Sequence, residues 1–188
     1  AGAAWNEENV ARCVGDLSKR IDQLPAQSPQ RVELLEKRAQ LHEYLARERS
    51  ASGDKNVQSA YEAALADYSA ALAIAPSNDA LRRKRAQLLM AMGRGEDALH
   101  DVETLLAQDP ASVRHQELKG AALASMKRHK EAIVVYTHAI ALAQSCAEAS
   151  MLQRQVNQYR HAFDPPLTRE QMREQARDIR NMPLYDVP

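Results

Sequence analysis

Apolar and small side chains recur along this chain at two spacings, one within segments and one between them. Within residues 6–24 they fall three and four positions apart, a spacing that predicts an amphipathic helix. The seam of that helix consists of Val10, Val14, Leu17, Ile21 and Leu24. Between later segments the period is 34 residues: Ala64, Tyr68, Ala71 and Pro76 align with Ala98, Val102, Leu105 and Pro110, and the first three again with Ala132, Tyr136 and Ala139. A fixed period of this size predicts a stack of repeated units with a long concave surface.

Start and stop signals divide the pattern into helices. Pro25 ends the first helix, and Ser28 followed by Pro29 is typical of the start of the next one. Further helices are expected over residues 57–74, 79–92, 96–108, 113–126, 130–143 and 147–161. We therefore predict an N-terminal packing helix (1–27), three helix pairs (28–76, 77–110 and 111–144), a capping helix (145–163) and a tail (164–188). Thr168 and Gln171 form a capping box in that tail, which predicts one short helix there.

The first helix pair departs from the period. The run from Lys37 to Leu41 recurs almost unchanged from Lys84 to Leu88, but the separation is 47 residues, thirteen more than one period. Either both helices of this pair are longer or the loop around Gly53 is enlarged. The helix-forming residues 44–49 favour longer helices, and hence a protruding hairpin.

Residues 30–144 resemble tetratricopeptide repeats. The family's pattern has a small residue in the first helix of each pair, an alanine early in the second, an aromatic residue four later, an alanine after three more, and a closing proline. One repeat fills these places with Ala86, Ala98, Val102, Leu105 and Pro110, and the next fills them with Gly120, Ala132, Tyr136 and Ala139. The resemblance implies an all-α, right-handed superhelix of antiparallel helix pairs with flanking helices at both ends.

In the family, the first helices of the pairs line the concave groove that holds a partner peptide or helix. Counted from the small positions, the groove residues are expected to be Glu36, Gln40, Glu43, Arg83, Lys84, Gln87, Met90, Arg114 and Glu117. Many members grip the acidic tail of heat-shock chaperones through a clamp of lysine, asparagine and arginine. Here Glu36, Gln40, Lys84 and Leu118 stand where those residues are needed, and Arg114 alone is compatible, so a clamp of this kind is disfavoured.

Composition narrows the classes of partner. Lysine plus arginine equals aspartate plus glutamate at 25 each, so no basic surface for nucleic acid is expected. The longest uncharged stretches are too short to span a bilayer, so we expect no membrane insertion and a soluble, cytoplasmic protein. Cys13 and Cys146 lie in helical patterns and are interpreted as reduced, buried thiols, with a bridge between them left open. Because the chain opens at Ala1 without a signal segment, we expect an excised piece of a longer protein.

No pattern in the chain indicates catalysis. The six histidines lack the spacing of a metal site, and the turn from Gly93 to Gly95 lacks the lysine and hydroxyl residue of a phosphate-binding loop. We therefore expect no metal, no cofactor and no enzyme activity. The expected function is recognition of a protein segment in the groove, as an adaptor, co-chaperone-like module or assembly scaffold. The alternative is a structural subunit that self-associates, or is fixed in a larger complex, through its N-terminal helix and long first hairpin. The tail has three candidate positions, in the groove, elsewhere on the stack, or against a second copy, or it is a simple linker.

Overall fold

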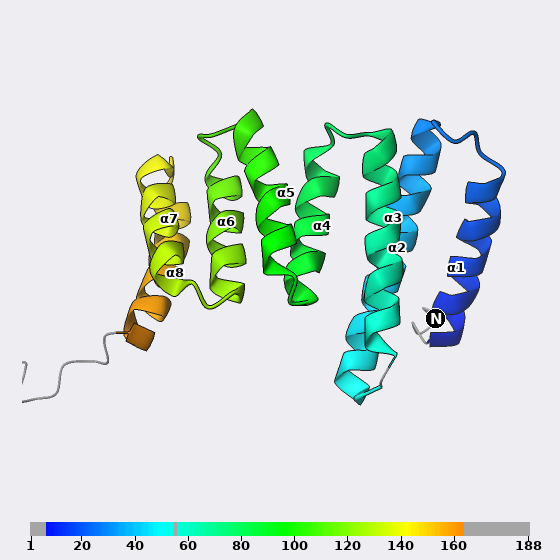
Figure 1. Cartoon of the computed structure of the whole chain (residues 1–188), viewed down its shortest axis with the longest axis horizontal. Helices are drawn as coiled ribbons and strands as arrows, with labels where there is room; N and C mark the ends of the chain where they lie inside the picture. Colours follow the sequence, from blue (N-terminus) through cyan, green and yellow to red (C-terminus); the bar gives the residue numbers. More distant parts are fainter. Residues whose placement is uncertain (1–6, 55, 164–188) are drawn as a thin grey trace, which may run out of the picture.

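The computed structural model describes residues 7–54 and 56–163, and every regular element in those ranges is an α-helix. In chain order the helices are α1 (Glu7–Asp22), α2 (Pro29–Ser52), α3 (Val57–Ile74), α4 (Asp79–Ala91), α5 (Gly95–Gln108), α6 (Val113–Ser125), α7 (His129–Leu142) and α8 (Cys146–Phe163). Figure 1 shows them standing side by side in one elongated stack, with α1 and α8 at opposite ends. The predicted superhelix of antiparallel helix pairs with a flanking helix at each end is confirmed.

Three helix pairs form the body of the stack. We call α2, α4 and α6 the A helices, and their partners α3, α5 and α7 the B helices. Each A helix carries a small residue at its closest approach to the B helix: Ala39 and Ala86 are fully buried, and a Cβ added to Gly120 would lie 2.6 Å from ring atoms of Tyr136. The small side chains let the two backbones approach closely, so the 34-residue period of the sequence is a period of helix packing.

The turns between paired helices share a left-handed residue. Gly93, between α4 and α5, has φ of 75°, and Lys127, 34 residues later, has φ of 61°. Glycine adopts this conformation without steric cost, whereas lysine does not. Gly95 has a different role, because a Cβ there would lie 2.8 Å from the sulfur of Met126, the residue that follows α6. It is therefore a packing residue between neighbouring pairs.

The thirteen additional residues of the first pair lengthen its helices. α2 has 24 residues and α3 has 18, whereas α4 and α6 have 13, and α5 and α7 have 14. Gly53 ends α2 in the left-handed conformation and donates its backbone N–H to the carbonyl oxygens of Arg49 and Ser50. The extension is covered by α1, whose Val10 is buried against Leu45, Ala46 and Ala60. The hairpin protrudes at one end of the stack, as Figure 1 shows.

Two buried ion pairs repeat along the stack. Arg38 on α2 holds Asp67 on α3 through Nε and Nη2, at 2.9 and 2.6 Å, and Arg85 on α4 holds Asp101 on α5 through the same atoms, at 2.8 and 2.5 Å. In both cases the remaining Nη1 donates to a serine on the preceding helix, Ser18 at 2.8 Å or Ser69 at 3.3 Å. These hydrogen bonds to aspartate raise the pKa of Arg38 and Arg85. One arginine thus ties three consecutive helices together.

The far end of the stack is closed by aromatic rings. Tyr159 on α8 stacks on Tyr136 of α7 with centroids 6.0 Å apart, and on His129 at 5.1 Å. Burial raises the pKa of Tyr136, so its hydroxyl stays protonated. Leu152 and Val156 complete the contact of α8 with this end of the core.

One expectation about the cysteines is wrong. Cys13 is an exposed free thiol and not a buried one, because it lies at the edge of the packed face of α1, beside an open cavity between α1 and α2. The short helix expected after Thr168 lies outside the described residues. No helix in the described part of the chain is both long and apolar enough to cross a bilayer.

Candidate functional site

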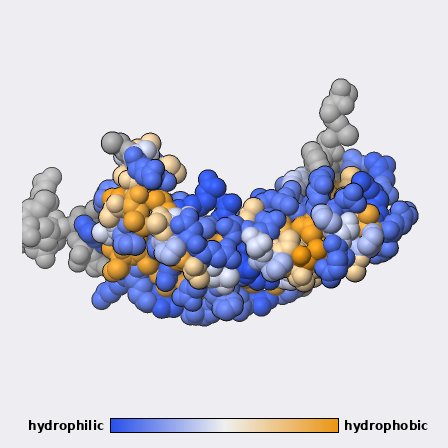
Figure 2. Space-filling model, turned by 90° about the horizontal axis from the view of Figure 1, so that it is seen from above, coloured by the Kyte–Doolittle hydropathy of each residue, from blue (hydrophilic) through white to orange (hydrophobic). Residues whose placement is uncertain are grey.

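A cavity of about 450 Å³ opens between the neighbouring A helices α4 and α6. It is lined by Arg83, Gln87 and Met90 from α4 and by Arg114 and Glu117 from α6, together with Leu118 and Ala121. Five of the nine groove residues expected from the sequence therefore meet in one place. Figure 2 shows that the whole stack is bowed, with one long side hollow.

Helical spacing explains why these side chains converge. Positions 83, 87 and 90 are four and three residues apart, as are 114, 117, 118 and 121, so each set forms one face of its helix. The cap of α6 fixes where its face begins: the Ser112 hydroxyl oxygen accepts the backbone N–H of His115 at 3.4 Å. Leu118 is buried in the core at the cavity floor, while Arg114 and Glu117 are exposed at its rim.

The two arginines of this cavity differ from those that tie the helices of the stack together. Arg38, Arg82, Arg85, Arg94 and Arg128 all bond an aspartate or glutamate. Among the residues that the structure describes, neither Arg83 nor Arg114 has a carboxylate within ion-pair distance. The cavity therefore combines two guanidinium groups, available for anionic ligands, with the apolar surface of Met90 and Leu118.

The other expected groove residues are engaged within the protein. Lys84 on α4 bonds Glu36 on α2 at 2.6 Å, and both side chains are about two-thirds buried, with 37% and 28% of their surface exposed. Gln40 donates to Glu36 at 3.3 Å. These contacts join two neighbouring A helices and leave Lys84 with an internal partner.

Glu43 is bound on the core side of α2. It accepts the Tyr68 hydroxyl at 2.7 Å and pairs with Arg47 at 3.0 Å. Burial is the main reason that the pKa of Tyr68 is raised, and the hydrogen bond to Glu43 adds to it. Glu43 thus satisfies a buried hydroxyl.

A second cavity, of about 720 Å³, lies between α1 and α2. Leu17, Leu41, Tyr44 and Cys13 give it an apolar lining, and Asp16, Arg20, Lys37 and Gln40 are the polar residues around it. Of these residues only Gln40 was expected in a groove, because the whole apolar face of the first helix was expected to pack on its neighbour. Leu41 was the residue that could have indicated this cavity. It comes two positions after Ala39, on a face of its helix that does not pack against the second helix of the same pair.

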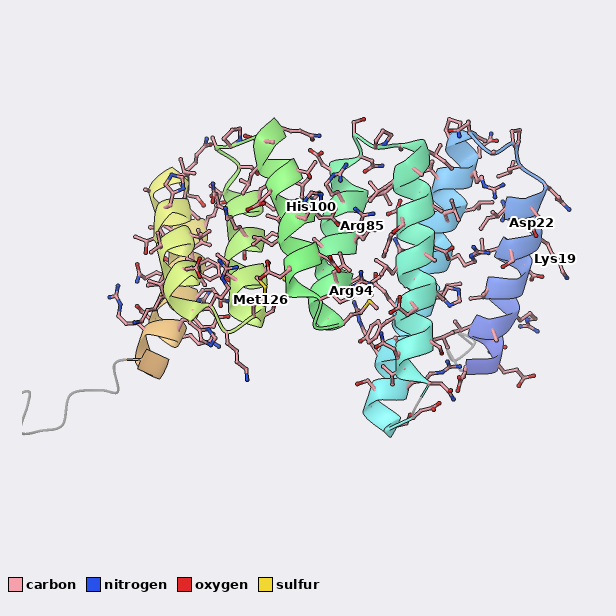
Figure 3. The ribbon with its side chains drawn as sticks, in the orientation of Figure 1. Lys19, Asp22, Arg85, Arg94, His100 and Met126 are labelled. Carbon is pink, nitrogen blue, oxygen red and sulfur yellow. The ribbon has the colours of Figure 1, made fainter. Side chains whose placement is uncertain are left out.

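A third cavity, of about 250 Å³, is lined by side chains that form ion pairs within the protein. It is bordered by Arg85, Arg94 and His100, which Figure 3 labels around α4 and α5. Arg85 is held by Asp101 and Arg94 by Asp97. Within the described ranges, no group of three or more histidine, cysteine, aspartate or glutamate side chains is arranged to hold a metal ion. The charged groups around this cavity thus pair with one another and connect α4 with α5.

Comparison with known proteins identifies a family for the central part of the chain. Residues 58–122, about a third of the chain, match the tetratricopeptide repeat family model. Solved structures similar to this chain include the first tetratricopeptide domain of human RPAP3 (19% identity over 66% of this chain and 93% of that one, TM-score 0.47). The Sgt2 tetratricopeptide domain from Aspergillus fumigatus has 24% identity over 69% of this chain and 86% of that one, with a TM-score of 0.44. The first such domain of Spaghetti (RPAP3), bound to the HSP90 peptide SRMEEVD, has 20% identity over 65% and 93%, with a TM-score of 0.45.

Proposed function

This chain carries tetratricopeptide repeats in residues 58–122, and from that premise we propose that it is a non-catalytic module that binds other proteins. The proposed ligand is a peptide or helix of a partner, held in the groove along the A helices. The observation that carries the proposal is the cavity between α4 and α6, in which Arg83 and Arg114 lie beside Met90 without an ion-pair partner among residues 7–54 and 56–163. An adaptor, a co-chaperone-like protein or an assembly scaffold of the cytoplasm would use such a site.

The chemistry of the cavity selects a class of segment. Two guanidinium groups favour carboxylates, and the Met90 and Leu118 surface favours an apolar side chain between or beside them. Glu117 at the rim disfavours a ligand that is acidic at every position. We therefore propose an acidic segment interrupted by an apolar residue.

A chaperone-tail carboxylate clamp is still disfavoured. Lys84 is paired with Glu36, and the position that would need arginine in the third repeat is Leu118, which is buried. We propose that the other residues expected in the groove shape it rather than bind its ligand; these are Glu36, Gln40, Glu43 and Lys84. We also retain as a proposal the division of the chain into a packing helix (1–27), three pairs (28–144), a capping helix (145–163) and a tail (164–188).

The test is binding to an immobilised library of acidic peptides that contain one apolar residue at varied positions. We expect the wild-type chain to retain a subset of these peptides, and Arg83→Glu combined with Arg114→Glu to weaken their binding at least tenfold. Loss of one charge-assisted hydrogen bond costs about 1.5–3 kcal/mol, which corresponds to about tenfold or more per arginine. Circular dichroism checks that the double variant remains folded.

Arg94→Glu is the matched control. Arg94 has similar charge and is 45% exposed, but its partner is Asp97 on its own helix and it lies outside the α4–α6 cavity. This variant should keep the binding of the wild type. Equal binding by the wild type and the double variant, or no retention of any acidic peptide, would refute the proposed site.

A further inference from the structure

α1 occupies the place of a B helix, and no helix in the described residues occupies the place of its A helix. The evidence is a hydrogen bond that repeats along the stack. Arg85 of α4 donates to Ser69 on α3, the preceding B helix. Arg38 of α2 donates to Ser18 on α1 in the same way. Relative to α2, α1 therefore stands where α3 stands relative to α4. Each of α3, α5 and α7 packs against an A helix that precedes it in the chain, whereas α1 packs on the A helix α2 that follows it and, in the described part of the chain, on none that precedes it.

The α1–α2 cavity lies where that missing A helix would pack. In the stack, an A helix contacts both its own B helix and the next A helix, as α4 contacts α5 and α6. A helix in the corresponding place would touch α1 and α2 together. The side chains that line the 720 Å³ cavity come from these two helices alone, with Leu17 and Cys13 on one side and Leu41 and Tyr44 on the other. Their apolar surface is what an amphipathic helix needs to bury.

Residues 168–181 of the chain have the pattern of such an A helix. Ala176 precedes Ile179 by three residues, as Ala86 precedes Leu89 in α4 and Gly120 precedes Leu123 in α6. Met172 precedes Ala176 by four, as Leu35 precedes Ala39 in α2. The segment has 14 residues between Thr168 and Asn181, close to the 13 of α4 and α6.

Charges on both surfaces complement one another. Arginines and carboxylates alternate along the segment. Arg173, Glu174, Arg177 and Asp178 stand next to its apolar positions in the sequence. The cavity is bordered by one carboxylate, Asp16, and two cations, Arg20 and Lys37. A helix with both signs can therefore meet both signs on the cavity rim.

The segment of the same molecule cannot reach this cavity. α8 ends at Phe163, at the opposite end of the stack from α1 (Figure 1). Thr168 follows five residues later, and five residues span at most about 18 Å when fully extended. Neighbouring helices pack about 8–10 Å apart, and six helices stand between α8 and α1. This segment can therefore fill the cavity only when it comes from another molecule.

We propose that residues 168–181 of a second copy bind as an A helix in the α1–α2 cavity and complete the repeat that α1 begins. The contact joins the tail end of one copy to the α1 end of the next, so it is heterologous and extends to chains of copies unless a ring closes. Self-association through the N-terminal helix is the alternative role expected from the sequence. The proposed contact assigns residues 168–181 as the partner segment in that role. It does not depend on the α4–α6 site.

Site-specific cross-linking of the full-length chain tests the contact. All variants carry Cys146→Ser. One copy keeps Cys13 and has an affinity tag, and the other combines Cys13→Ser with Met172→Cys and has no tag. We expect a short bismaleimide to link the tagged copy to the untagged copy, so that affinity purification under denaturing conditions retains both in one band of heterodimer size.

The control moves the thiol along α1. Cys13→Ser with Lys19→Cys puts it on an exposed residue that does not line the cavity, and Figure 3 shows Lys19 at the outer side of α1. Linkage through Cys13 should exceed linkage through position 19 by at least tenfold. Equal yields would overturn the proposal, and so would a single copy carrying both thiols that cross-links only within itself.

Sedimentation velocity supplies an independent readout on the full chain. The wild type should associate with rising concentration, and Met172→Glu combined with Ile179→Glu should leave a monomer with an unchanged circular dichroism spectrum. Cys13→Arg, which fills the cavity from an exposed position, should have the same effect. A wild type that is monomeric at every concentration overturns the proposal, as does association that persists in both variants, since a different surface or a different partner then accounts for it.

Discussion

Replacing Asp101 with asparagine tests whether the repeated arginine ties hold the stack together. The Asp101 side chain is only 1% exposed, and it accepts hydrogen bonds from Nε and Nη2 of Arg85 and lies 3.5 Å from Nη1 of Arg82. Asparagine keeps the size and one acceptor oxygen but removes the charge. Both guanidinium groups then remain against α5 without a counter-ion.

The magnitude follows from burial. Removing one partner of a fully buried ion pair costs about 3–5 kcal/mol, because the other charge stays desolvated. Arg85 and Arg82 keep 22% and 14% of their side-chain surface exposed, so water still reaches them in part. Asparagine also still accepts one hydrogen bond, which is worth about 1 kcal/mol. We therefore expect Asp101→Asn to lower the free energy of unfolding by about 2–3 kcal/mol.

Urea unfolding followed by circular dichroism at 222 nm measures this change. Asp97→Asn is the control, because Asp97 pairs with Arg94 three residues away on an exposed surface, 54% and 45% exposed, and such pairs contribute about 0.2–1 kcal/mol. A fall of less than about 0.5 kcal/mol for Asp101→Asn, or a fall equal to that of the control, would show that the buried pair adds no stability. The reasoning about the repeated ties would then be wrong.

Three further substitutions probe single features of the stack. Gly120→Ala should lower the free energy of unfolding by about 1–3 kcal/mol despite alanine's better helix propensity, because the added Cβ would lie 2.6 Å from the Tyr136 ring; a higher midpoint in urea would contradict this. Lys127→Gly should raise that free energy by about 0.5–1 kcal/mol, since lysine there has φ of 61° where Gly93 occupies the equivalent turn, and an unchanged midpoint would count against it. His42→Gln should flatten the pH dependence of stability. Burial lowers the pKa of His42 in the folded chain below 6.5, so as pH falls below 6.5 the unfolded chain takes up the proton first and the wild type loses stability. Unfolding curves between pH 5 and 7.5 should therefore show a steeper acid loss for the wild type, and parallel profiles would refute the assignment.

The helices were largely predictable because each boundary has a local cause. Asn78 and Ser112 cap α4 and α6 by accepting backbone N–H groups three residues later, and Gly53 ends α2. These signals are contained in a few neighbouring residues, so observed and expected helix ends differ by at most two residues. Lys127 shows the limit: it takes the left-handed turn without any local preference for it, because the packed helices on both sides leave no alternative.

The candidate sites depend on relations between helices, which a sequence pattern does not contain. Helical spacing put Arg83, Gln87 and Met90 on one face, and the period brought Glu117 and Arg114 to the neighbouring helix. The pattern did not reveal that Lys84 bonds Glu36, because that contact depends on how far α4 is rotated against α2. The α1–α2 cavity was missed for a related reason: it depends on how α1 packs against α2, and among the described residues no helix covers it.

Because α1 covers the long hairpin, we expect α1 and the extension of α2 to have evolved together. Val10 is buried against Leu45 and Ala46, and the positions equivalent to these in the second repeat are Met92 and Gly93, where α4 has already ended. Glu7 pairs with Arg49, a further turn along the extension. The first half of α1 therefore packs on residues that are helical only because α2 is lengthened. Related chains that lack the thirteen inserted residues should also lack the first two turns of α1, since the helix and the insertion can be gained or lost only together without exposing an apolar surface.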